Sequence, residues 1–169
     1  RNPVYQAAQS EIRMLARNTS AVANLVVPED ANGVYLHRIG AKDHPVPVGG
    51  SVRLHAAAAG KAILAFRSRD AIDEYVTRYG LDRKTERTVT DRATLRSELR
   101  SIRDRNIAFD RGELDANWQC VASPIVVDGD PVGAVSVSGP SDEMQGKRLE
   151  EDTAGLVSSA AKTIELELL

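Results

Sequence analysis

The sequence predicts an α+β domain, with one mainly antiparallel β-sheet and helices packed on it. Strand-like segments lie towards both ends of the chain, with helical segments between and outside them. Two reversal signals, Asn32-Gly33 and Asp128-Gly129-Asp130, each separate a pair of strand-like segments, as expected of antiparallel hairpins. A length of 169 residues suits one domain with a substantial core. Only 4% of the residues are aromatic, so that core must depend on Ala, Val, Leu and Ile.

The first third of the chain predicts a helix followed by a hairpin. Over residues 3–18 apolar residues recur at helical spacing, and Pro3 suits a first helical turn. Residues 21–27 and 34–39 are predicted strands. The segment 40–50 contains several Pro and Gly residues and predicts a loop.

Three helices are predicted next. The first covers residues 56–66 and includes four consecutive alanines, and the second covers 70–79 and ends at Gly80. Asp91 is the predicted N-cap of the third. Its buried stripe contains Leu95, Leu99 and Ile102.

The last third predicts a short strand at residues 107–109, a hairpin and a terminal helix over 146–168. The hairpin strands are residues 118–124 and 135–140. Because side chains alternate faces along a strand, Ser136 and Ser138 share one face. Cys120 and Ala122 share a face of the preceding strand. If the two faces coincide, a thiol and two hydroxyls converge on a small patch. Either this patch binds a small polar ligand, or it is a solvated sheet face on which both serines form hydrogen bonds with backbone or water.

Three stretches occur in an order that resembles a known family. They are His55-Ala56-Ala57-Ala58-Ala59-Gly60-Lys61-Ala62-Ile63-Leu64-Ala65, then Phe109-Asp110-Arg111-Gly112-Glu113, then Trp118 to Pro124 with Val135 to Pro140. The ordered set resembles the effector-binding domain of IclR-family transcription regulators, over nearly the whole chain. The resemblance implies a GAF/profilin-like fold. It also implies that the family's N-terminal winged helix-turn-helix DNA-binding domain lies outside residues 1–169.

The resemblance implies a ligand site with no catalytic residue. Main-chain groups of Ala58 and Ala59 would contact a carboxylate-bearing effector. An acidic side chain would face the pocket, either Asp110 or, as the fallback, Glu113. The remaining implied ligand-binding residues are Trp118, Cys120, Ser136 and Ser138.

Two residues leave structural alternatives. Trp118, where the family often has a smaller apolar residue, either walls the pocket or anchors the sheet core. Lys61 could pair with the anion, but a position on the exposed outer face of its helix is expected, since most lysines are solvated. The alanine run itself also suits tight packing of the helix on the sheet.

Composition limits the function classes. A net charge of −2 argues against a nucleic-acid-binding surface. No apolar run is long enough to cross a bilayer. The single Cys cannot form an internal disulfide, and the three His show no metal-ligand spacing. We therefore expect a cytoplasmic chain with no metal, no cofactor and no membrane partner.

The sequence thus favours a small-molecule sensor rather than an enzyme. A small organic acid would control DNA binding by the absent domain allosterically, in a homodimer or homotetramer. Two alternatives remain open: a GAF-like enzyme using Cys120 and a purely structural oligomerisation domain. The enzyme would need a base beside the thiol, and neither a second Cys nor a paired His is apparent.

Overall fold

Six strands form one antiparallel sheet in the order β3-β2-β1-β6-β5-β4. The computed structural model describes residues 2–40 and 43–169. The strands are β1 (Val22–Glu29), β2 (Asn32–Ile39), β3 (Ser51–Arg53), β4 (Ala108–Arg111), β5 (Trp118–Val127) and β6 (Asp130–Pro140). The hairpins from the two ends of the chain meet where β1 pairs with β6, which confirms the predicted α+β class.

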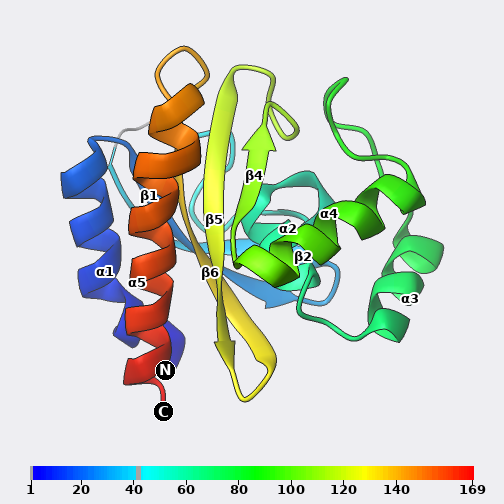
Figure 1. The fold of residues 1–169 in the computed structure, drawn as a ribbon, viewed down its shortest axis with the longest axis horizontal. Coiled ribbons are helices and arrows are strands. Elements are labelled where there is room, and N and C mark those ends of the chain that lie inside the picture. Colours follow the sequence, from blue (N-terminus) through cyan, green and yellow to red (C-terminus); the bar gives the residue numbers. More distant parts are fainter. Residues whose placement is uncertain (1, 41–42) are drawn as a thin grey trace.

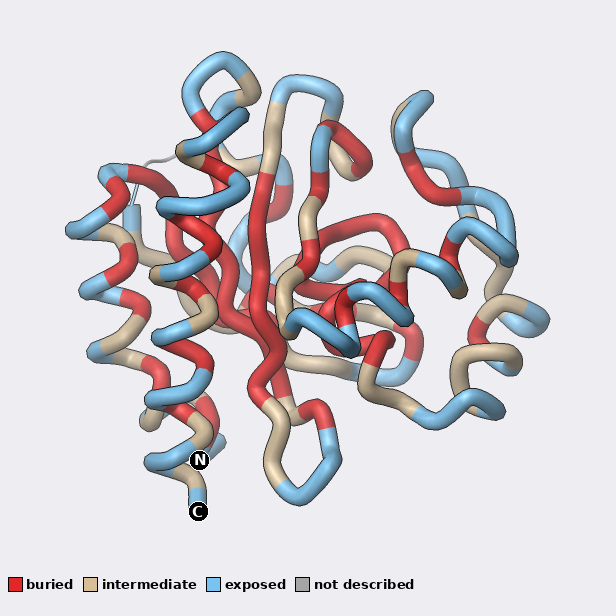
Figure 2. The backbone as a smooth tube through the Cα atoms, in the orientation of Figure 1, coloured by how far each residue is buried: buried red, intermediate tan, exposed pale blue. Residues whose placement is uncertain are grey.

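Helices cover both faces of the sheet (Figure 1). One side carries α1 (Pro3–Thr19) and α5 (Ala154–Glu167), which pack on each other. The other side carries α2 (Ala58–Leu64), with α3 (Arg69–Tyr79) and α4 (Arg92–Arg105) outside it. Figure 2 shows buried backbone through the central strands and alternating buried and exposed turns along the outer helices. Two apolar cores result, one on each face of the sheet.

Local sequence signals set most element boundaries. The side chain of Asp91 accepts a hydrogen bond from the Thr94 N–H at 2.9 Å, as predicted for an N-cap. Gly80 ends α3 with a φ of +71°. Asp30 and Asp128 adopt the left-handed conformation in the two hairpin turns, each with a φ of 54°. Short polar side chains tolerate that conformation better than most residues.

The predicted helix over residues 56–66 is shorter in the structure. A 3₁₀ turn covers Leu54–Ala56, and an extended Ala57 separates it from α2. The small residues of this segment are needed for packing, because a Cβ on Gly60 would lie 2.3 Å from the carbonyl oxygen of Leu54.

The predicted terminal helix begins differently in the structure, and the predicted 40–50 loop is described in part. The predicted helix over residues 146–168 starts with a π-helical turn, Arg148–Thr153, which runs into α5. Of the predicted loop 40–50, residues 41 and 42 lie outside the described residues, and the rest contains no helix or strand.

Candidate functional site

The strand register gathers polar side chains on the face of the sheet that α2 covers. Asp110 on β4 is opposite Cys120 on β5, and Cys120 is opposite Ser138 on β6. Ser136 is opposite Ala122 in the next row of the same face. Residues directly opposite across antiparallel strands project to the same side. The predicted convergence of thiol and hydroxyl groups is therefore present, and all three polar side chains of the first row are buried.

A small enclosed cavity lies between this face and the start of α2. Its volume is about 10 Å³, room for roughly one water molecule. Five of the seven predicted ligand-binding residues line it: Ala58, Asp110, Trp118, Cys120 and Ser138. Ala59 and Ser136 are buried nearby, but they are not among its lining residues.

Asp110, rather than Glu113, is the acid that faces the cavity. The Glu113 backbone N–H donates to Oδ1 of Asp110 at 2.6 Å and fixes its orientation. Burial, and then the nearby Glu113 charge, raise the pKa of Asp110 to about 7. The Asp110 carboxyl can therefore be protonated near neutral pH, and it can then donate a hydrogen bond to an anion.

Lys61 is fully buried, so its expected position on an exposed helix face is wrong. Its Nζ lies 2.7 Å from Oε1 of Glu98 on α4 and 2.6 Å from Oε1 of Glu113. The helix α2 is enclosed by the sheet and α4, which leaves no solvated face for the side chain. The two carboxylates compensate the buried ammonium. Lys61 thus holds the turn that presents Asp110, rather than facing a ligand.

Cys120 does not have the surroundings of a nucleophile. Burial, and then the Asp110 charge, raise the pKa of its thiol to about 12. Hydrogen bonds with Ser138 and Ser136 lower this pKa, but by less than burial raises it. At neutral pH the thiol is therefore protonated, whereas attack requires the thiolate. Among the described residues the thiol's hydrogen bonds involve a backbone carbonyl and these hydroxyls, and no imidazole. The arrangement suits a wall of a binding site rather than catalysis.

Trp118 walls the cavity and is not an anchor of the sheet core. It is half-buried at the start of β5, and its ring centroid lies 5.4 Å from that of His44. A second, larger pocket of about 260 Å³ is also lined by Trp118 and Ser138, together with residues 20–22 and residues of the 138–148 segment. Trp118 and Ser138 therefore border both cavities.

Several residues near the site were not predicted from the sequence. Tyr35 and His44 line the cavity from the side of β2. Asn24 on β1 is opposite Ser136 and fully buried. Its Oδ1 accepts from Nε of Arg38 at 2.7 Å, whereas its Nδ2 has no partner in the part of the chain that the structure describes. A polar residue within the apolar segment 21–27 was the available signal for Asn24.

In residues 2–40 and 43–169, no group of three or more His, Cys, Asp or Glu side chains is placed to hold a metal ion. Over the same residues no helix combines the length and apolar character that a membrane span requires.

The whole length of the chain matches one protein family. The family described as "Bacterial transcriptional regulator IclR C-terminal" matches residues 1–166. The chain belongs to the IclR family. The regulator BhcR of Paracoccus denitrificans is 30% identical over 166 residues, which is 95% of this chain and 59% of BhcR. The chain thus spans about three fifths of the length of that relative, which is itself a transcription regulator.

Solved structures of IclR proteins have the same fold. The IclR structure from Thermotoga maritima superposes with a TM-score of 0.93 and 29% identity, covering 99% of this chain and 69% of that one. An IclR homologue from Microbacterium hydrocarbonoxydans, solved in complex with 4-hydroxybenzoate, superposes with a TM-score of 0.88 and 25% identity. That comparison covers 98% of this chain and 68% of the other. The fold is therefore that of the IclR effector-binding domain, with its GAF/profilin-like architecture.

Proposed function

We propose that this chain senses a small organic acid for an IclR-type regulator. The acid would bind between the start of α2 and the face of the sheet that carries Cys120 and Ser138. Backbone N–H groups of Ala58 and Ala59, which lack intrahelical acceptors at a helix start, would bind the carboxylate. Asp110 and the serine hydroxyls would bind the remaining polar atoms. The observation that carries this proposal is the shared cavity of Ala58, Asp110, Cys120 and Ser138.

The cavity must enlarge before an effector can enter. A volume of about 10 Å³ is far below the roughly 300–1,000 Å³ of ordinary ligand pockets. Trp118 and Ser138 line both this cavity and the pocket of about 260 Å³. Rotation of the indole would join the two spaces, with Ser138 between them. An acid of the size of 4-hydroxybenzoate, the ligand of the Microbacterium homologue, would then fit.

Effector binding would act through a shift between two arrangements of the regulator. A ligand that binds the opened pocket stabilises that state by its difference in affinity for the two states. The opened state would change how a winged helix-turn-helix domain, outside these residues, engages DNA. Assembly into a homodimer or homotetramer would convert this change into a different spacing on the operator. A regulator of transcription acts on DNA, so we expect it in the cytoplasm.

Thermal-shift measurements test the proposal. The 169-residue chain is heated with 4-hydroxybenzoate, benzoate, pyruvate or glyoxylate, and with benzyl alcohol as a control without a carboxylate. We expect at least one acid to raise the unfolding temperature in a concentration-dependent way, because a ligand that binds the folded form stabilises it. The neutral control should have no effect.

The two alternatives give different results. A structural oligomerisation domain would show no shift with any acid at millimolar concentration. An enzyme dependent on Cys120 would turn over a substrate and lose activity on thiol alkylation. The raised thiol pKa, to about 12, predicts slow alkylation at neutral pH and so disfavours the enzyme.

A further inference from the structure

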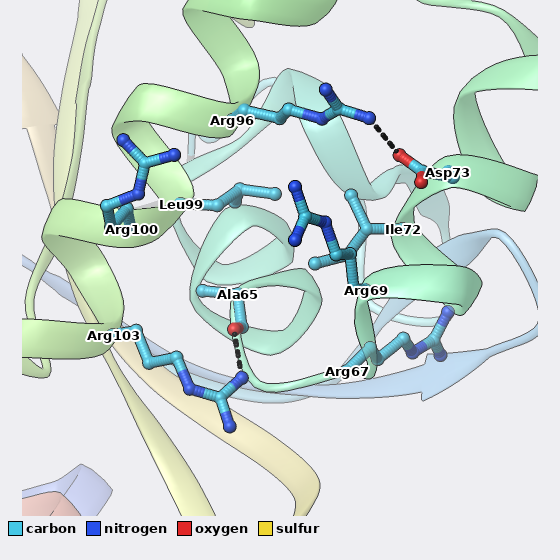
Figure 3. Close-up of a pocket in the computed structure, with 9 residues that line it drawn as sticks. All are labelled: Ala65, Arg67, Arg69, Ile72, Asp73, Arg96, Leu99, Arg100 and Arg103. Carbon is cyan, nitrogen blue, oxygen red and sulfur yellow. Dashed lines mark hydrogen bonds and ion pairs between the residues drawn. The ribbon is translucent and has the colours of Figure 1, made fainter.

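A groove between α3 and α4 is lined by five arginines. They are Arg67, Arg69, Arg96, Arg100 and Arg103. The groove has a volume of about 290 Å³, and Ala65, Ile72 and Leu99 supply its apolar part. In Figure 3 Arg69 and Arg96 lie beside the side chains of Ile72 and Leu99, and Arg100 lies on the other side of Leu99. The groove is distinct from the cavity at the other end of α2.

The groove carries a concentrated positive charge in a chain whose net charge is −2. Among the described residues the one carboxylate that lines it is Asp73, 2.7 Å from Nη2 of Arg96. A second arginine, Arg92, also approaches Asp73, at 3.7 Å. Five guanidinium groups against one carboxylate leave four uncompensated positive charges along the lining.

Within the part of the chain that the structure describes, the other four lining arginines form no ion pair with a carboxylate. Arg67 donates to the carbonyl of Asp30 and Arg103 to that of Ala65, both at 3.1 Å. Among residues 2–40 and 43–169, the side chains of Arg69 and Arg100 make no hydrogen bond or ion pair. Their donors are free to bind an incoming anion.

The spacing of the arginines along α4 is unfavourable for the stability of that helix. Arg96, Arg100 and Arg103 follow one another at intervals of four and three residues, so they line one side of the helix. Like charges at these intervals destabilise a helix slightly. Two arginines of the row have structural contacts, since Arg96 pairs with Asp73 and Arg103 donates to the Ala65 carbonyl. Among the described residues Arg100 has no such contact, so folding gives no reason for its position, whereas binding of an anion would.

We propose that this groove binds a small organic phosphate. The planar forks of Arg69 and Arg100 can each donate two hydrogen bonds to a phosphate group, which carries more than one negative charge at neutral pH. Arg96, which is paired with Asp73, adds positive charge to the groove. Ile72 and Leu99 would contact the apolar body of the ligand. The chemistry is that of a phosphate monoester with a compact aromatic or aliphatic group.

A small ligand fits the groove better than a nucleic acid does. The groove gathers five arginines, while the chain as a whole has a net charge of −2. The other arginines of α3 and α4, Arg78, Arg92 and Arg105, are exposed outside the groove and are not part of its lining. Binding to a duplex depends on many phosphate contacts along an extended basic surface. One phosphate group with a short body needs only the groove.

Isothermal titration with phenyl phosphate tests the proposal. We compare the unaltered chain with the double variant Arg69→Gln/Arg100→Gln, and with Arg78→Gln/Arg105→Gln as the matched control. The control removes the same charge from exposed positions of the same two helices, outside the groove. We expect the groove variant to bind at least tenfold more weakly and the control less than twofold. All four arginines are exposed, so both variants should fold, as circular dichroism will verify.

Comparison probes identify what the groove recognises. Inorganic phosphate should bind more weakly than phenyl phosphate, because it lacks the apolar body, and phenol should not bind. Affinity for phenyl phosphate should rise between about pH 5 and pH 7, as the second phosphate proton is lost.

Four results would overturn the proposal. The first is no binding of phenyl phosphate at millimolar concentration, and the second is equal weakening in both double variants. The third is loss of binding in Ser138→Val, and the fourth is displacement of phenyl phosphate by a DNA duplex that binds more tightly. The third result would place the probe in the cavity beside Cys120. The fourth would identify the groove as a nucleic-acid surface.

Discussion

The backbone N–H of Glu113 lies 2.6 Å from Oδ1 of Asp110, while the carboxylate of the same Glu113 lies 2.6 Å from Nζ of Lys61. One residue thus links a fully buried lysine of α2 to the acid that faces the cavity. Glu98 extends the connection to α4 through a second ion pair with Lys61. The orientation of Asp110 therefore depends on side chains that do not reach the cavity themselves.

Replacement of Lys61 by Met should destabilise the chain by about 3–5 kcal/mol, since it leaves the buried carboxylate of Glu113 without its partner. Urea unfolding measures the change. The matched control is Lys147→Met, which removes an exposed ion pair with Asp152 and should cost less than about 1 kcal/mol. Adding Glu113→Gln to Lys61→Met should recover part of the loss. Equal destabilisation by the two lysine variants would contradict the structural role of Lys61.

The raised pKa of Asp110, about 7 against an ordinary 3.8, predicts a pH-dependent stability. The folded state holds this proton more tightly than the unfolded state, so the stabilisation is present below about pH 4 and is lost as the pH rises through 7. Asp110→Asn removes this titration. The free energy of unfolding of Asp110→Asn relative to the unaltered chain should therefore increase from pH 4 to pH 8. Measuring this difference by urea unfolding cancels the opposite effect of His44, whose pKa burial lowers to about 4. A constant difference over this range would mean that Asp110 ionises normally.

Ser138→Val should weaken effector binding roughly tenfold to a hundredfold. The substitution nearly keeps the volume and removes a hydroxyl, and an unpaired ligand oxygen in a buried site costs about 1–3 kcal/mol. Stability should change little. Titration with the acid identified by thermal shift gives the affinity, and urea unfolding gives the stability.

Ser123→Val is the matched control for Ser138→Val, on the adjacent strand and the opposite face. The Ser123 hydroxyl donates to the carbonyl of Asn106 at 2.7 Å, so its loss should reduce stability without changing affinity. If Ser138→Val behaves like Ser123→Val, Ser138 has a structural role only.

Trp118→Leu should enlarge the cavity and admit bulkier acids, because the indole lines both pockets and leucine is smaller. The ratio of affinities for 4-hydroxybenzoate and pyruvate should shift towards the aromatic acid. Stability should fall only modestly, since Trp118 lies outside both apolar cores. An unchanged ligand preference would mean that the effector does not approach Trp118.

The end of α5 predicts self-association. Leu166, in the last turn of α5, is 70% exposed, and its burial against another chain would remove apolar surface from water. Light scattering at high protein concentration should give the mass of a dimer or tetramer. Leu166→Glu should shift that mass towards the monomer, whereas a monomer mass for the unaltered chain would exclude the prediction.

The sequence was sufficient for features that depend on neighbouring residues. Helical spacing located α1, α3 and α4, and the Asp-Gly signal located the second hairpin, because these patterns act within a few residues. The Asn32-Gly33 signal indicated the first hairpin but not its turn, which is at Asp30 and Ala31, since Asn32 and Gly33 begin β2. Strand alternation placed Ser136 and Ser138 on one face before any partner was known. The resemblance to the IclR family then placed Asp110 and Cys120 beside them.

Tertiary packing alone decided the burial of Lys61, the position of Trp118 and the formation of the arginine groove. Lys61 has the sequence context of an exposed lysine, and it is buried because Glu98 and Glu113, 37 and 52 residues further along, close over it. Trp118 lies at the cavity because its strand begins there. The arginine groove joins residues on both sides of the 80–91 connection that no local pattern relates. Burial, cavity volume and charge compensation depend on which distant segments meet, and periodicity contains no information about that.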